Sequence, residues 1–118
     1  MRDFKSFTFW QDAVSLSADI CIMTRRFPEE ERYALGDQMR RASVSIISNI
    51  AEGSGRYSDS DFVHFLDISL GSSYEVEAQL YVAEKLGYIN KEELAQFLNA
   101  LCSIQRRIAA FIKKIRNL

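Results

Sequence analysis

The spacing of the apolar residues constrains the fold of this chain more than any other feature. In the segments 30–52 and 91–117, apolar residues recur at intervals of three, four or seven. Residues at this spacing lie on one face of an α-helix. Each segment is therefore predicted to be a helix with one apolar stripe. The stripes consist of Leu35, Met39, Ala42, Ile46 and Ile50 in the first segment, and of Leu94, Leu101, Ile104, Ile108, Ile112 and Ile115 in the second.

Turn-forming residues divide the chain into four helices. Pro28 precedes three glutamates, a pattern that favours a helix start, and Gly87 is placed as a helix stop. Asn90 with Glu93 three residues later is a capping pattern. The expected helices span about 10–26, 30–52, 59–86 and 91–117. Because the linkers are short, the chain is predicted to be one all-α domain, residues 1–118, folded as an antiparallel up-down-up-down four-helix bundle.

Two of these helices carry apolar residues away from their main stripes. The additional residues are Val44, Ile47 and Ala51 in the second helix, and Val63, Leu70, Tyr74 and Tyr81 in the third. A helix that is apolar on two sides is buried on two sides, and one bundle covers only one side of most helices. We therefore expect a second copy of the chain to cover these residues. The alternative is a thick core within one chain, with some exposed apolar residues.

The sequence offers little for catalysis. His64 is the only histidine, and its pairing with Asp61 supplies one half of a di-metal bundle motif that needs two. The glycines around residue 54 lack the context of a phosphate-binding loop. The chain is therefore predicted not to be an enzyme, and to have no cofactor, no metal and no small-molecule substrate.

A polar motif at the end of the second helix has two interpretations. Asn49, Glu52 and Gly53 lie close together in sequence, and Arg56 follows them. In the structural interpretation, Glu52 accepts hydrogen bonds from the free N–H groups of the next helix and Arg56 pairs with a carboxylate. In the other, the motif contacts a partner or a nucleic acid. An enzyme site at Asn49 and Glu52 is a distant third option.

The charges are distributed unevenly, although the net charge is only −1. Residues 57–105 hold eight acidic and two basic side chains, whereas residues 106–118 hold five basic and none acidic. The five basic residues are predicted to form an outward cationic face opposite the isoleucine stripe. Such a face also complements the helix dipole in a structural role. The candidate nucleic-acid contacts are Arg106, Arg107, Lys113, Lys114 and Arg116, followed by Arg40, Arg41 and Arg56.

Several copies of this cationic face would sum their phosphate contacts, which predicts weak, salt-dependent binding of structured RNA or DNA. The rival hypothesis is an adaptor that docks a partner enzyme through its outer helix faces.

The sequence also predicts the compartment. Residues 1–10 carry charges and no apolar block of the kind found in a signal peptide, and no segment is apolar for long enough to span a bilayer. Cys21 and Cys102 are isolated, so both are expected to be buried, reduced thiols. These features predict a cytoplasmic protein.

A set of motifs then points to a family. In order along the chain they are Trp10-Gln11-x-Ala13-x-x-Leu16, Phe27-Pro28-x-Glu30, Tyr33-x-Leu35-x-x-Gln38-x-Arg40-Arg41-Ala42, Ser45-Ile46-x-x-Asn49-Ile50-Ala51-Glu52-Gly53, Phe62-x-x-Phe65-Leu66, Gly71-Ser72-x-x-Glu75-x-Glu77-x-Gln79-Leu80 and Leu86-Gly87-Tyr88. With them, the chain resembles the bacterial four-helix bundle proteins encoded in intervening sequences of 23S ribosomal RNA genes. The similarity is close over residues 7–90 and looser over the last helix.

The resemblance implies a left-handed four-helix bundle and a homopentamer, as in the related accessory proteins of diversity-generating retroelements. Those relatives form a basic barrel that binds nucleic acid and a reverse transcriptase. This chain differs from them in not being basic overall. The resemblance brings no catalytic residue with it.

Overall fold

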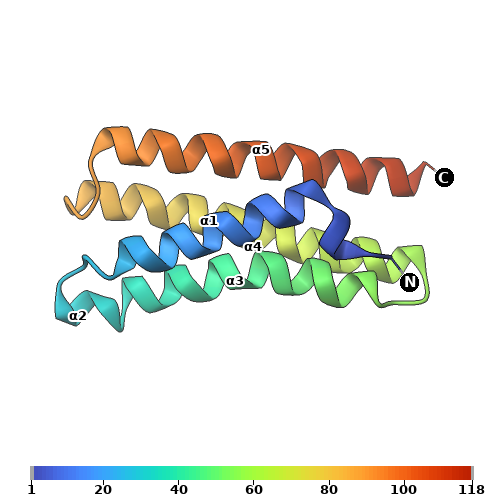
Figure 1. Ribbon diagram of the computed structural model, residues 1–118, viewed down its shortest axis with the longest axis horizontal. Helices are drawn as coiled ribbons and strands as arrows, with labels where there is room; N and C mark the ends of the chain where they lie inside the picture. Colours follow the sequence, from blue (N-terminus) through green and yellow to red (C-terminus); the bar gives the residue numbers. More distant parts are fainter. Residues whose placement is uncertain (1, 118) are drawn as a thin grey trace.

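The computed structural model describes residues 2–117, and four long helices account for most of them (Figure 1). They are α1 (Thr8–Thr24), α3 (Leu35–Ser54), α4 (Asp59–Lys85) and α5 (Lys91–Arg116). A short 3-10 turn, η1 (Phe4–Ser6), precedes α1, and the single turn α2 (Glu29–Arg32) lies between α1 and α3. The long helices run back and forth along one axis of a body of 46 × 24 × 20 Å. The predicted four-helix bundle is confirmed.

Each long helix packs against two others, which closes a ring in the order α1, α3, α4 and α5. The contact between α3 and α4 is the most extensive, and that between α1 and α5 is the least extensive. Ile20, Ile46, Leu66 and Ile104 bring one fully buried side chain from each helix into the core. The predicted stripes therefore face inward, because only that orientation removes them from water.

Local chemistry sets the helix ends, as predicted at Gly87 and Asn90. The Ser58 side chain accepts a hydrogen bond from the Asp61 backbone N–H at the start of α4. Asn90 and Glu93 form a reciprocal capping box at the start of α5. Gly87 has φ +80, the left-handed conformation in which glycine commonly follows the end of a helix.

The segment predicted as one helix over 30–52 is interrupted. Its first turn is α2, and Ala34, with φ −114 and ψ −98, separates this turn from α3. The Arg40 guanidinium donates to the Arg32 carbonyl at 2.7 Å and to the Thr24 hydroxyl at 2.9 Å, so it satisfies polar atoms at the break. A Cβ at position 36 would lie only 3.2 Å from the Glu31 carbonyl, and the glycine there lets the two turns approach.

None of the helices within residues 2–117 is both long enough and apolar enough to cross a membrane.

Candidate functional site

The five basic residues near the end of α5 do not form one outward face. Arg107 turns toward α1, where its guanidinium donates to the Asp12 carboxylate at 2.6 Å. Arg116 turns toward α4 and donates to the Asp67 carboxylate at 3.2 Å. Because α1 and α4 flank α5 on different sides, the two arginines point apart. The prediction of a single cationic face opposite the isoleucine stripe is therefore wrong for this pair.

The other three cations, Arg106, Lys113 and Lys114, are exposed. Within residues 2–117, no carboxylate lies within 4.0 Å of any of them. Arg106 and Lys113 are seven residues apart and so share one face of the helix, with Lys114 beside them. We call these three residues the α5 cation set. It is the part of the predicted cationic face that stays available to an external anion.

The arginines of α3 and of the turn after it have partners within the chain. Arg40 braces the break before α3 and lies 3.6 Å from the Asp37 carboxylate. Arg41 lies 3.3 Å from Asp37, but its side chain is 81% exposed. Arg56 donates to Glu52 at 3.1 Å and stacks 4.5 Å over the Phe65 ring. Of these candidate contacts, Arg41 is the one that the structure leaves most open to solvent.

The polar motif at the end of α3 makes contacts within the chain. The Asn49 amide donates to the Ser45 carbonyl and hydroxyl at 2.8 and 2.9 Å, and the Ser45 hydroxyl lies 2.8 Å from that of Ser72 on α4. Glu52 accepts from Arg56, which confirms that Arg56 pairs with a carboxylate. The expectation that Glu52 caps the next helix is wrong, because Ser58 performs that role.

Gly53 is the tightest point of the motif. A Cβ built there would lie 2.6 Å from the Phe65 Cβ and 3.1 Å from the Phe62 ring. The glycine is therefore what allows α3 and α4 to meet closely at this end of the bundle.

The residues predicted to lie against a second copy divide into two groups. Val63 is only 7% exposed and belongs to the core, so it needs no second copy; the expectation for it is wrong. Ile47 and Leu70 pack at the edge of the same core, and Ala51 is half-buried. The thick core that was the alternative accounts for these side chains.

Three of the predicted interface residues keep large exposed side chains. Val44 is 43% exposed, Tyr74 55% and Tyr81 51%. Ile68 and Val82 on α4 are also exposed, as is Leu86 directly after this helix, and the sequence pattern did not indicate these three residues. Within residues 2–117, α4 carries more large exposed apolar side chains than any other helix, although the two most exposed, Tyr33 and Tyr57, lie between helices.

The two cysteines differ in burial, and Cys21 is half-buried. Cys102 lies on the exposed side of α5, so the expectation of a buried thiol is wrong there.

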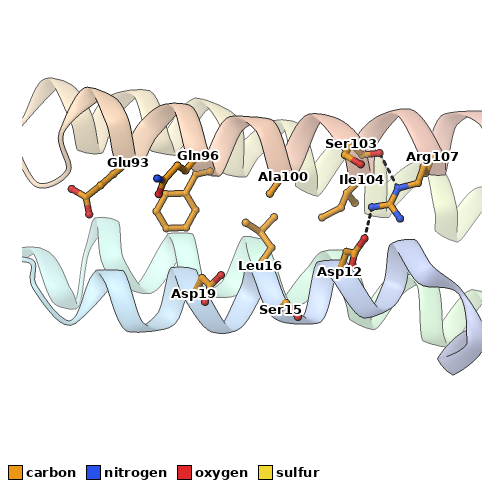
Figure 2. Close-up of a pocket in the computed structure, with 11 residues that line it drawn as sticks. Asp12, Ser15, Leu16, Asp19, Glu93, Gln96, Ala100, Ser103, Ile104 and Arg107 are labelled. Atoms are coloured by element: carbon orange, nitrogen blue, oxygen red, sulfur yellow. Dashed lines mark hydrogen bonds and ion pairs between the residues drawn. The ribbon is translucent and has the colours of Figure 1, made fainter.

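A groove between α1 and α5, with a volume of about 460 Å³, was not anticipated (Figure 2). Leu16 and Ile104 extend into it from the two helices, and Asp12, Asp19 and Arg107 lie along its rim. A sequence signal for it exists in retrospect. Asp12 and Asp19 are seven residues apart on α1, and small residues such as Ser15 and Ala100 occupy positions where larger side chains would fill the seam.

Comparison with known proteins agrees with this architecture. The model of the family described as 23S rRNA-intervening sequence protein matches residues 5–110. A crystal structure of a protein of unknown function from the S23 ribosomal protein family of Bacteroides thetaiotaomicron is similar, with a TM-score of 0.83 and 23% identity. The alignment covers 90% of this chain and 99% of that chain, and at this identity it shows a shared fold alone. No curated protein matches the chain.

Proposed function

The chain belongs to the 23S rRNA-intervening sequence protein family, and from this premise we propose that it is a non-enzymatic, self-associating helical module that binds structured RNA or DNA weakly in the bacterial cytoplasm. The observation that carries the proposal is the α5 cation set, Arg106, Lys113 and Lys114. These three side chains are exposed, and none has a carboxylate within 4.0 Å inside residues 2–117. They can therefore contact phosphates without first breaking an ion pair.

Self-association would strengthen phosphate binding by the cation set. Three cations in one chain make a weak phosphate site, whereas several copies on one assembly bring many phosphate contacts together. Val44, Tyr74 and Tyr81 remain exposed in a single chain and are the candidate contacts between copies. The homopentamer implied by the resemblance is the assembly that we propose.

The test is a salt series with a fluorescently labelled RNA hairpin. Charge reversal of the cation set, as R106E/K113E/K114E, should weaken binding at least about tenfold at low salt. Each phosphate contact releases a counterion from the RNA, and this favourable contribution is lost with the contact. The matched control is R25E/K85E/K91E, which reverses three other exposed cations. An affinity that stays flat between low and moderate salt, or an equal loss in the control, would contradict the proposal.

Light scattering on the nuclease-treated protein tests the assembly separately. We expect a mass several times that of one chain. A lone chain at micromolar concentration would contradict self-association.

The exposed apolar side chains of α4 favour a second candidate, an adaptor that docks a partner enzyme such as a reverse transcriptase without touching nucleic acid. Tyr74 and Val82 on this helix, and Leu86 directly after it, are about half exposed. The same triple variant separates the two candidates, since it should leave partner capture intact if the protein is an adaptor.

A further inference from the structure

The interface between α1 and α5 is built differently from the other three interfaces between neighbouring long helices. We call these interfaces the seams of the bundle. Those seams carry hydrogen bonds from buried side chains: Ser17 with Ser43, Ser69 with the Ile46 carbonyl, and Gln105 with Glu77. The hydrogen bonds between α1 and α5, by contrast, gather near the ends of the seam. Arg107 holds Asp12 at one end, and Arg26, just beyond α1, holds Glu93 at 2.6 Å at the other.

Between these two ion pairs the seam opens into the groove of Figure 2. Leu16 and Ile104 are buried at its base, and Phe97 is half-buried beside them. The residues from Glu93 to Arg107 span about 21 Å of helix at 1.5 Å per residue. The groove is thus as long as nearly four helical turns, which suits a docked helix better than a compact small molecule.

The charges along the groove select its occupant. Three carboxylates, those of Asp12, Asp19 and Glu93, line it against the single cation Arg107. Asp12 and Glu93 are paired, whereas the exposed Asp19 has no ion pair inside the described part of the chain. A nucleic acid would bring phosphates against these carboxylates and is disfavoured here. An occupant with apolar side chains on one face and a lysine or arginine aimed at Asp19 is favoured.

We propose that this groove docks a basic amphipathic helix of a partner protein. A second copy of this chain is a poorer occupant, because α4, the helix with the most large exposed apolar side chains, also carries acidic residues such as Glu75 and Glu84. Those carboxylates would face Asp19. The inference goes beyond RNA binding, since the groove and the α5 cation set share no residue. Failure of one proposal therefore leaves the other standing.

The probe is a capped 16-residue helical peptide made of leucine, alanine and lysine, with its leucines three and four residues apart. A twin peptide with glutamate in place of lysine is the comparison. Fluorescence anisotropy should show the lysine peptide binding the intact protein at least about tenfold more tightly than its twin, because charge sign decides which helix the rim accepts.

Two variants and a control place the binding in the groove. Asp19→Lys should weaken binding of the lysine peptide about tenfold, since an attraction becomes a repulsion. Ala100→Trp, which fills the groove from the exposed side of α5, should also weaken it. The matched control is Glu75→Lys, which makes the same charge change on α4 and should leave the affinity within about twofold. Far-UV circular dichroism checks that each variant is folded.

Photo-crosslinking gives an independent readout. A photoreactive residue at the centre of the lysine peptide should crosslink to residues 12–19 and 93–107. Crosslinks confined to other helices, or an unchanged affinity of Asp19→Lys, would overturn the proposal. If the peptide instead lowers the solution mass of an assembly to that of one chain, the groove is occupied by a second copy, and the partner proposal is wrong.

Discussion

Replacement of Gly53 by alanine is the sharpest test of how α3 and α4 fit together. The new Cβ would lie 2.6 Å from the Phe65 Cβ, 3.1 Å from the Phe62 ring and 3.3 Å from the Phe62 carbonyl. Carbon atoms in contact are normally about 3.5–4.0 Å apart, so the helices must separate locally by about 1 Å. The Phe65 Cβ is attached directly to the α4 backbone, so a change of side-chain rotamer cannot move it out of the way.

Two opposing effects set the size of the change. Overpacking of a tight interface costs about 1–3 kcal/mol, whereas alanine gains about 0.5–1 kcal/mol over glycine inside a helix. Because three contacts are too short at once, we expect the overpacking to exceed the gain. Gly53→Ala should lower the free energy of unfolding by about 1–2 kcal/mol.

Gly71→Ala is the matched control. A Cβ at Gly71 in the middle of α4 meets no atom within 4 Å among the described residues. The substitution there therefore adds only the higher helix propensity of alanine. This variant should raise the free energy of unfolding by about 0.5–1 kcal/mol. Urea unfolding, followed by far-UV circular dichroism at one protein concentration, measures both variants. If Gly53→Ala is as stable as the wild type or more so, the close approach of α3 and α4 is not what the structure indicates.

Two further predictions concern the arginine that braces the break and the capping box. Arg40→Ala should lower the free energy of unfolding in urea by about 1–3 kcal/mol, because the Arg32 carbonyl and the Thr24 hydroxyl lose their donor. The control is Arg41→Ala, which removes the same charge from an exposed position and should stay within about 0.5 kcal/mol of the wild type. The Asn90 backbone N–H, and then Arg26, hold the pKa of Glu93 below its ordinary value of 4.5. The carboxylate form therefore stabilises the fold above pH 4.5, and this contribution is lost as the pH falls through the lower folded pKa. Glu93→Gln should flatten the acid side of the stability profile in thermal unfolding, and an unchanged profile would contradict this assignment.

The elements that the sequence predicted well are those fixed by local chemistry. The isoleucines of α5 recur at helical spacing, and the Asn90 capping box and Gly87 act within a few residues of themselves. Signals of this kind need no knowledge of the rest of the fold.

The errors arise where distant parts of the chain decide the outcome. The segment around Ala34 contains no proline, and its break depends on Arg40 reaching back to Arg32 and Thr24. Arg107 points away from the other cations because Asp12, 95 positions earlier, lies beside it in the fold. Val63 lies a quarter turn from the apolar stripe of α4 and is nevertheless buried. A helical wheel treats each helix alone and contains none of these neighbours.

The α1–α5 seam has a consequence for how the bundle comes together. The other three seams each join helices that follow one another along the chain, whereas this one joins the first long helix to the last. The entropic cost of bringing these two helices together is therefore the largest of the four. The packing between them is the least extensive. We expect consecutive helices to pair early in folding, with the first and last helices meeting at the end, and the same seam to part first when the native state fluctuates.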